Sequence, residues 1–182
     1  MTRVGLVGYG SSGAGFHAPL LREAGLDLVA VVTGNPERAD QARAENPGVV
    51  VVPDLAALVA VPDLDVVVVA SPSGRHVEHA EALLEAGIAV VVDKPIATDA
   101  HQAQGLVDLA AGRGVPLTVF QNRRYDPEFA TIRDLLHRGV LGELRRTEMR
   151  WDRWRPVPKD RWRERATAAE GDPSASRCDA VR

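Results

Sequence analysis

Residues 4–13 read VGLVGYGSSG. Within them, Gly8, Gly10 and Gly13 fit the spacing G-x-G-x-x-G directly after a short apolar run. In a dinucleotide-binding turn the first glycine permits the tight turn, the second lets the backbone approach a pyrophosphate, and the third lets a helix pack closely on a strand. The helix that follows offers unpaired N–H groups to the phosphates. An ordinary glycine-rich loop is the alternative, and the position between a predicted strand and a predicted helix argues against it.

Short valine-rich runs recur along the rest of the chain, and each is apolar on both faces of an extended strand. They cover residues 4–7, 28–32, 49–52, 66–70, 89–92 and 117–120. Continuous apolar runs are typical of strands that a parallel sheet buries on both faces. Helices are predicted over residues 20–24, 36–45, 55–60, 76–86, 99–111 and 125–137. The alternation predicts an α/β fold, a Rossmann-type doubly wound parallel sheet with helices on both faces.

Composition limits the partners and the compartment. The 182 residues carry a net charge of −3 and one cysteine, Cys178, so neither a nucleic-acid partner, an anionic membrane nor a disulfide is expected. Aromatic and basic residues interleave over residues 150–163, a pattern that can bind single-stranded nucleic acid, but acidic residues dilute the charge there. No run is long enough for a transmembrane helix or a signal-peptide core. We therefore expect a cytoplasmic protein with no membrane partner.

The pattern predicts two domains and a tail. Residues 1–122 are expected to form the dinucleotide-binding domain, and residues 123–165 to begin an α+β second domain that is incomplete. A strand over residues 143–151 would open a second sheet, and its unpaired edge would favour self-association, which leaves a homo-oligomer open. Residues 166–182 show no periodicity and are expected to be a disordered tail.

The end of the second predicted strand bears on the choice of cofactor. An acidic residue there would bind the ribose 2′-hydroxyl of NAD, but the nearest one, Asp27, lies at the wrong end of the strand. Thr33, Asn35 and Arg38 could instead hold the 2′-phosphate of NADP. The sequence therefore favours NADP over NAD while leaving both open, and a solvated role for Arg38 remains the alternative.

Three segments make the chain resemble the glucose–fructose oxidoreductase / inositol dehydrogenase / MocA (Gfo/Idh/MocA) family. The first is the glycine turn with FHAPL at residues 16–20, the second is SPSGRH at 71–76 with VDKP at 92–95, and the third is FQNRRYDP at 120–127. Their order and spacing match the family over residues 3 to about 163. The resemblance implies an NAD(P)-dependent oxidoreductase that transfers hydride between a nicotinamide cofactor and a small-molecule substrate, namely a sugar, a cyclitol or a related alcohol or ketone.

The resemblance also assigns roles to particular residues. It implies that Lys94 lies where nicotinamide meets substrate, where an ammonium can hydrogen-bond the reacting hydroxyl and stabilise developing negative charge. A surface lysine just past a strand is the alternative. It further implies that Asn122 and Arg124 line the substrate pocket. The expected cofactor-binding residues are Gly8, Tyr9, Gly10, Ser11, Ser12, Gly13, Thr33, Asn35, Arg38, Ser71, Pro72, His76, Asp93, Lys94 and Pro95.

A metal site is not predicted. His76 and His79 lie three residues apart on a predicted helix, but no third ligand is near them in the sequence. We expect His76 to belong to the cofactor loop and His79 to be exposed.

The chain also departs from the family pattern. Family members are longer, and their second domain supplies an Asp-x-x-x-His arrangement that acts with the lysine, whereas no histidine follows His137 here. We therefore expect a truncated chain with impaired activity, through a frameshift or a true terminus. The alternatives are a non-catalytic dinucleotide-binding module and an inactive gene fragment.

Overall fold

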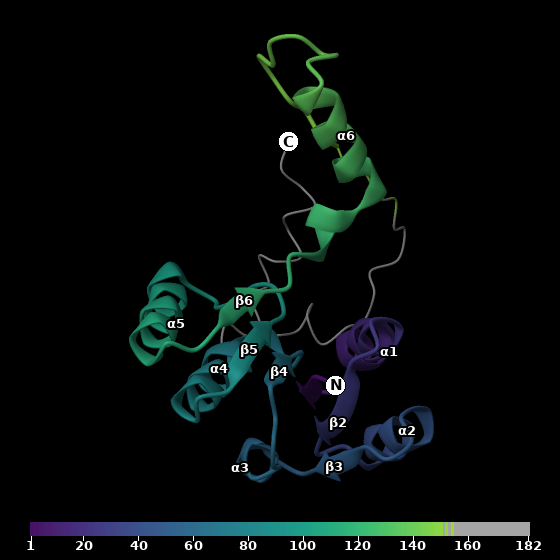
Figure 1. The fold of residues 1–182 in the computed structure, drawn as a ribbon, viewed down its shortest axis with the longest axis vertical. Helices are drawn as coiled ribbons and strands as arrows, with labels where there is room; N and C mark the ends of the chain where they lie inside the picture. The colour runs from purple at the N-terminus through teal and green to yellow at the C-terminus, as the bar shows by residue number, and fades with distance from the viewer. Residues whose placement is uncertain (151, 153, 155–182) are drawn as a thin grey trace.

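The computed structural model describes residues 1–150, 152 and 154. Six parallel strands form one sheet in the order β3-β2-β1-β4-β5-β6 (Figure 1). They are β1 (Arg3–Val7), β2 (Asp27–Val32), β3 (Val50–Val52), β4 (Val66–Val69), β5 (Ala89–Val92) and β6 (Leu117–Val119). Every valine-rich run forms a strand, and the Rossmann-type parallel sheet predicted from the sequence is confirmed.

Helices connect the strands. They are α1 (Ala18–Glu23), α2 (Pro36–Glu45), α3 (Leu55–Val59), α4 (His76–Glu85), α5 (Ala100–Arg113) and α6 (Pro127–His137), with short helical segments η1 (Gly13–His17), η2 (Ser73–Arg75) and η3 (Asn122–Tyr125). Asp99 caps α5 by accepting a 2.9 Å hydrogen bond from the backbone N–H of Gln102, as expected for an acidic N-cap. The helix continues through Gly112 and ends at Gly114, whose φ of +65° is the left-handed conformation that glycine adopts easily.

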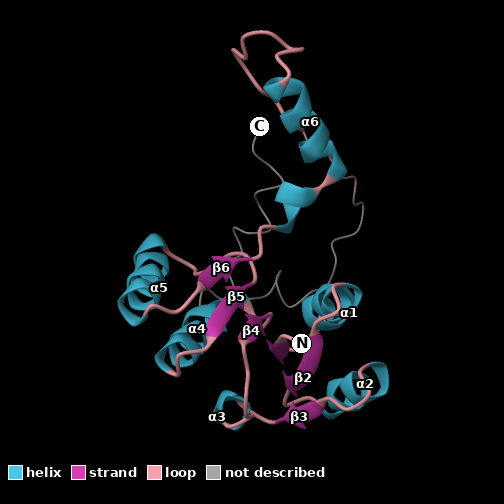
Figure 2. Ribbon diagram, in the orientation of Figure 1, coloured by secondary structure: helices cyan, strands magenta, loops and turns pink. Residues whose placement is uncertain are grey.

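The sheet separates two hydrophobic cores. Alternate side chains of a strand point to opposite faces, so Leu6 packs on one side of β1 and Val7 on the other. The core containing Leu6 lies under α1 and α2, and the core containing Val7 lies under α3, α4 and α5 (Figure 2). Helices on both faces are why the central strands are apolar throughout rather than alternating.

The helix after the glycine turn begins earlier than predicted. The backbone is helical from Ser11, and the N–H of Ala14 donates to the carbonyl of Gly10 at 2.8 Å. Five residues of this path, Gly13–His17, form a π-helical segment that leads into α1. Pro19 lies in the first turn of α1 and has no N–H for the helix hydrogen-bond pattern. The pattern changes just before it, from α-helical bonds to the wider π-helical turn. The prediction of a helix starting at residue 20 missed this segment.

The region after β6 also differs from expectation. Helix α6 projects away from the sheet and buries none of its residues (Figure 1). No strand forms over residues 143–150, so the predicted strand over 143–151 is wrong for the described part, and Trp151 lies outside the described residues. A strand requires a hydrogen-bonded neighbour, and no described segment pairs with this one. The predicted tail, 166–182, and the end of the predicted second domain lie outside the described residues. Within the described part of the chain, no helix has the length and apolar character needed to cross a membrane.

Candidate functional site at the carboxyl edge of the sheet

The topology places a cleft where β1 and β4 end. The chain winds outward from β1 in one direction through β2 and β3 and in the other through β4, β5 and β6, and ligands of such sheets bind where the direction reverses. A cleft of about 530 Å³ opens there. Of the residues predicted to bind cofactor, those that line the cleft are Gly8, Tyr9, Gly10, Ser11, Ser12, Thr33, Asn35, Arg38, Ser71, Pro72, His76, Asp93 and Lys94. Gly13 and Pro95 lie outside its lining.

The three glycines of the turn differ in the space around them. Gly8 has a φ of +96°, and a Cβ there would lie 2.9 Å from the carbonyl oxygen of Ala70. A Cβ on Gly13 would lie 2.0 Å from the carbonyl oxygen of Gly8, so that position has room only for glycine. A Cβ on Gly10 would meet nothing closer than the guanidinium of Arg38, 3.7 Å away. Gly8 and Gly13 therefore shape the turn, whereas Gly10 leaves open space beside it, as a pyrophosphate cradle requires.

Tyr9 lies between two of these glycines but faces the interior. Its side chain is 1% exposed. The hydroxyl donates to Glu45 Oε2 at 2.7 Å and accepts from Asn46 Nδ2 at 2.7 Å. Burial and the neighbouring Glu45 raise the pKa of Tyr9, although the hydrogen bond from Asn46 acts in the opposite direction. The side chain anchors the turn to the end of α2, so any contact with a ligand falls to the backbone.

Arg38 supplies positive charge at one end of the cleft. It is exposed on α2, and its guanidinium forms no ion pair or hydrogen bond with any described residue. The side-chain oxygen of Asn35 accepts a 3.0 Å hydrogen bond from the backbone N–H of Arg38 and so caps the helix. Thr33 Oγ1 accepts from the backbone N–H of Asn35 at 3.3 Å. The three residues predicted to receive a 2′-phosphate are therefore neighbours, and the cation among them is available to an anion.

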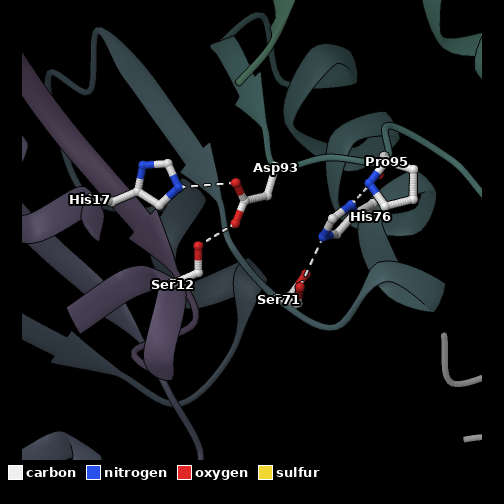
Figure 3. A network of polar contacts seen from close by, with 6 residues as sticks. All are labelled: Ser12, His17, Ser71, His76, Asp93 and Pro95. Carbon is white, nitrogen blue, oxygen red and sulfur yellow. Dashed lines mark hydrogen bonds and ion pairs between the residues drawn. The ribbon is translucent and has the colours of Figure 1, made fainter. Parts of the chain in front are cut away.

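Asp93, at the end of β5, joins the glycine turn to the opposite side of the cleft (Figure 3). Ser12 Oγ donates to Asp93 Oδ2 at 2.5 Å, and His17 Nε2 lies 3.3 Å from Asp93 Oδ1. Burial alone would raise the pKa of Asp93, but the contacts with His17 and Ser12 outweigh it and hold the pKa below its ordinary value. The carboxylate is therefore ionised at neutral pH and holds the first helix against the end of β5.

His17 is a member of this cluster that the sequence did not single out. It is buried, its ring lies 4.5 Å from that of Phe120, and its Nε2 has no hydrogen-bond partner among the described residues. The 3.3 Å approach to Asp93 is thus an electrostatic contact rather than an aligned hydrogen bond. The sequence assigned His17 no role because the helix around it was not predicted.

Two histidines of α4 face the cleft loops. His76 is 1% exposed, and its ring nitrogens contact two backbone carbonyl oxygens, Nδ1 that of Pro95 at 2.7 Å and Nε2 that of Ser71 at 2.8 Å (Figure 3). His79 Nδ1 lies 2.9 Å from Ser71 Oγ. The prediction that His79 is exposed is wrong, because its side chain faces the loop after β4 and is buried. Burial and the charge of Arg75 lower the pKa of His79, opposed by Glu78.

Lys94 is exposed on the wall of the cleft, immediately after Asp93, and the peptide bond between Lys94 and Pro95 is cis. No group of three or more His, Cys, Asp or Glu side chains in the described residues is arranged to hold a metal ion. The two predicted substrate-binding residues, Asn122 and Arg124, belong to η3 beyond β6 and do not line the cleft. Their role stays a prediction.

Comparisons with known proteins point to one family. A family model described as an oxidoreductase family with an NAD-binding Rossmann fold matches residues 2–121. The chain is 42% identical over 169 residues to the uncharacterized oxidoreductase YdgJ of Escherichia coli K12, covering 93% of this chain and 48% of YdgJ. It is 36% identical over 169 residues to the scyllo-inositol 2-dehydrogenase (NADP(+)) IolW of Bacillus subtilis, covering 93% of this chain and 47% of IolW.

A solved structure has the same fold over most of this chain. It is that of a variant of KijD10, a 3-ketoreductase from Actinomadura kijaniata, in complex with TDP-benzene and NADP. It matches 79% of this chain and 44% of its own with a TM-score of 0.71 and 30% identity. The chain spans about half the length of the curated relatives that it matches.

Proposed function

This chain belongs to the Gfo/Idh/MocA family of oxidoreductases, and from that membership we propose that it carries the dinucleotide-binding part of an NAD(P)-dependent enzyme. The proposed reaction transfers hydride between a nicotinamide cofactor and a sugar, a cyclitol or a related alcohol or ketone. We assign cofactor binding to residues 1–122 and the beginning of a substrate domain to residues 123–165. The observation that carries the proposal is the cleft at the reversal of strand order, where Gly10 leaves space beside the backbone and Lys94 stands exposed on the wall.

The glycine turn is proposed to hold the pyrophosphate. A helix begins at Ser11, beside Gly10, and the unpaired N–H groups and the dipole of a helix N-terminus favour a phosphate at that place. Ser12 also fixes the turn to β5 through Asp93. A bound nicotinamide would supply or accept the hydride.

Lys94 is proposed to be the catalytic residue. Its position after β5 puts an ammonium on the cleft wall, and no described residue forms an ion pair with it. An ammonium there can donate a hydrogen bond to the reacting oxygen of the substrate and stabilise the negative charge that develops on this oxygen during hydride transfer. Its chemistry is polar stabilisation and proton donation, so replacing it should reduce turnover more than cofactor binding.

NADP is proposed as the preferred cofactor. The support is the guanidinium of Arg38, which lies beside Thr33 and Asn35 and pairs with no described residue, since an arginine can contact a phosphate through two parallel hydrogen bonds. Two relatives point the same way, because the name of IolW includes NADP(+) and the KijD10 variant was solved with NADP.

Titration with NADPH and NADH, followed by fluorescence, tests both parts of the proposal. We expect the folded chain to bind both, and NADPH more tightly. Arg38→Ala should reduce NADPH affinity by about tenfold or more, the loss of a charge-assisted pair, and leave NADH affinity nearly unchanged.

Arg43→Ala is the matched control. Arg43 lies on the same helix, is paired with Asp40 at 3.0 Å and does not line the cleft, so its loss should affect neither cofactor. A folded protein that binds neither dinucleotide would refute the proposed function. Equal losses for NADPH and NADH in Arg38→Ala would refute the assignment of the 2′-phosphate site.

A further inference from the structure

His76 bridges two loops that lie at the end of different strands. Ser71 follows β4 and Pro95 follows β5, and the imidazole lies between their carbonyl oxygens at 2.8 and 2.7 Å (Figure 3). Both loops contribute residues to the cleft wall, Ser71 from one and Lys94 from the other. The neighbouring β4 and β5 are held by ladder hydrogen bonds, and the ladder extends as far as the backbone N–H of Asp93, which donates to the carbonyl of Val69 at 2.9 Å. The bridge therefore continues the connection past the end of the sheet.

The chemistry of the two contacts restricts the form of the ring. A carbonyl oxygen only accepts hydrogen bonds, so both contacts are hydrogen bonds only when each ring nitrogen carries a hydrogen. A ring with a single N–H would turn a lone pair toward one of the carbonyl oxygens. With the side chain 1% exposed, water has little access to replace either contact. Each contact is therefore a hydrogen bond only if the ring nitrogen there donates, which nitrogen-15 NMR of the ring can decide.

The residues on either side of Lys94 are both held. Before it, Asp93 donates its backbone N–H to Val69 at 2.9 Å, and its carboxylate accepts from Ser12. After it, the Pro95 carbonyl accepts from His76. The backbone of Lys94 is thus held by two elements distant in sequence, the glycine turn and α4, although its own side chain forms no hydrogen bond or ion pair with a described residue.

We propose that His76 is a positioning residue for the nicotinamide end of the cleft. Protein carbonyls contact both of its ring nitrogens, so we assign it this role in addition to the cofactor contact expected from the sequence. It acts by fixing the Lys94 loop relative to the Ser71 loop. The inference rests on the proposed function, because it assumes that a nicotinamide lies beside Lys94.

The test compares a complete cofactor with the fragment that lacks nicotinamide. NADPH is paired with 2′-phospho-ADP-ribose, or NADH with ADP-ribose if NADH binds more tightly. Both members of a pair contact the glycine turn, but one alone reaches the Lys94 loop. We expect His76→Asn to reduce the affinity for the complete cofactor by about tenfold and to change the affinity for the fragment by no more than about twofold. The variant should also shift the emission of the bound reduced nicotinamide.

His79→Asn is the matched control, because His79 is also a buried histidine of α4 next to Ser71 but forms no hydrogen bond with the Lys94 loop within the described residues. It should leave the ratio of the two affinities unchanged. Equal weakening of cofactor and fragment in His76→Asn would reveal a general structural role and overturn the inference, as would a wild-type protein that binds both ligands equally. A wild-type protein that binds neither would refute the proposed function instead.

A measurement on the wild-type chain decides the bridge without any variant or ligand. Nitrogen-15 NMR of His76 should show two protected ring N–H groups, one for each carbonyl. A single ring N–H would overturn the inference. This result would be decisive even if His76→Asn did not fold or the wild-type chain bound no dinucleotide.

Discussion

Adding one methyl group to the glycine turn should have opposite effects at Gly13 and at Gly10, which are three residues apart in the sequence. At Gly13 a Cβ would lie 2.0 Å from the carbonyl oxygen of Gly8, far inside the 3.4 Å at which ordinary contact begins. That oxygen belongs to the backbone, so no side-chain rotation relieves the overlap. Overpacking costs about 1–3 kcal/mol and occasionally more, and Gly13→Ala should lie at the upper end of this range. A loss of about 3 kcal/mol lowers the melting temperature of a chain of this size by roughly 6–12 °C.

At Gly10 the fold should tolerate the same methyl group. Its nearest neighbour would be the flexible guanidinium of Arg38 at 3.7 Å, and the glycine does not adopt a positive φ. A Gly→Ala change at a compatible position stabilises a protein by about 0.4–1 kcal/mol through the unfolded chain. The methyl would nevertheless occupy the space through which a pyrophosphate approaches the backbone. Gly10→Ala should therefore keep or raise the melting temperature and lose at least about tenfold in dinucleotide affinity.

Thermal melts and fluorescence titration with NADPH, run on both variants, measure the two effects separately. Gly105→Ala is the control, because it lies in α5 away from the cleft with no atom within 4 Å of an added Cβ. It should leave binding unchanged and stabilise the helix by roughly 0.5–1 kcal/mol. Unchanged NADPH affinity in Gly10→Ala, or equal melting temperatures for the Gly10 and Gly13 variants, would refute this division of roles.

Three further predictions concern stability. Asp93→Asn should lower the free energy of unfolding at neutral pH, and its difference from the wild type should shrink as the pH falls toward 3. The reason is that a carboxylate whose pKa is depressed in the folded state stabilises the fold above its unfolded pKa of about 3.9 and loses that contribution as the pH falls through the folded pKa. A difference that does not change with pH in denaturant melts would contradict this. Tyr9→Phe should cost about 0.5–1.5 kcal/mol in urea unfolding by removing the hydrogen bonds of the buried hydroxyl with Glu45 and Asn46, whereas Tyr125→Phe, at an 86% exposed position, should cost almost nothing. Asp99→Ala should cost about 0.5–2 kcal/mol by removing the cap of α5, and a loss no greater than that of Asp108→Ala in the same helix would show that the cap contributes little.

The strands were predictable because uninterrupted runs of apolar, β-branched residues indicate strands that are buried on both faces. A strand such as 66–69, four valines in succession, suits a position covered by helices on both faces and few others. Its neighbours in space depend on parallel pairing between segments far apart in sequence, which the alternation with helices implied. The position of the glycine turn followed from the same argument, since a turn that ends a central strand lies at the edge where ligands bind.

The predictions that were wrong or missing have a common cause. A local sequence pattern does not specify which distant segment will pack on a residue or pair with a strand. His79 lies at the border of the apolar stripe of α4, and its burial depends on the loop after β4 that folds over it. Residues 143–150 are five-eighths charged and have no neighbour to pair with among the described residues. His17 was overlooked because a π-helical segment has neither the spacing of an α-helix nor that of a strand.

The place of β1 in the sheet has a consequence for how the chain is made. This strand is synthesised before the other five strands of the sheet, yet it lies in the middle of the sheet between β2 and β4. Its second edge stays unpaired until residues 66–69 have emerged, which at about 5–20 residues per second leaves the nascent chain for seconds with an unpaired apolar edge. Removing residues 3–7 would take away the central strand, and the helices that pack on both of its faces would lose part of the apolar surface they cover.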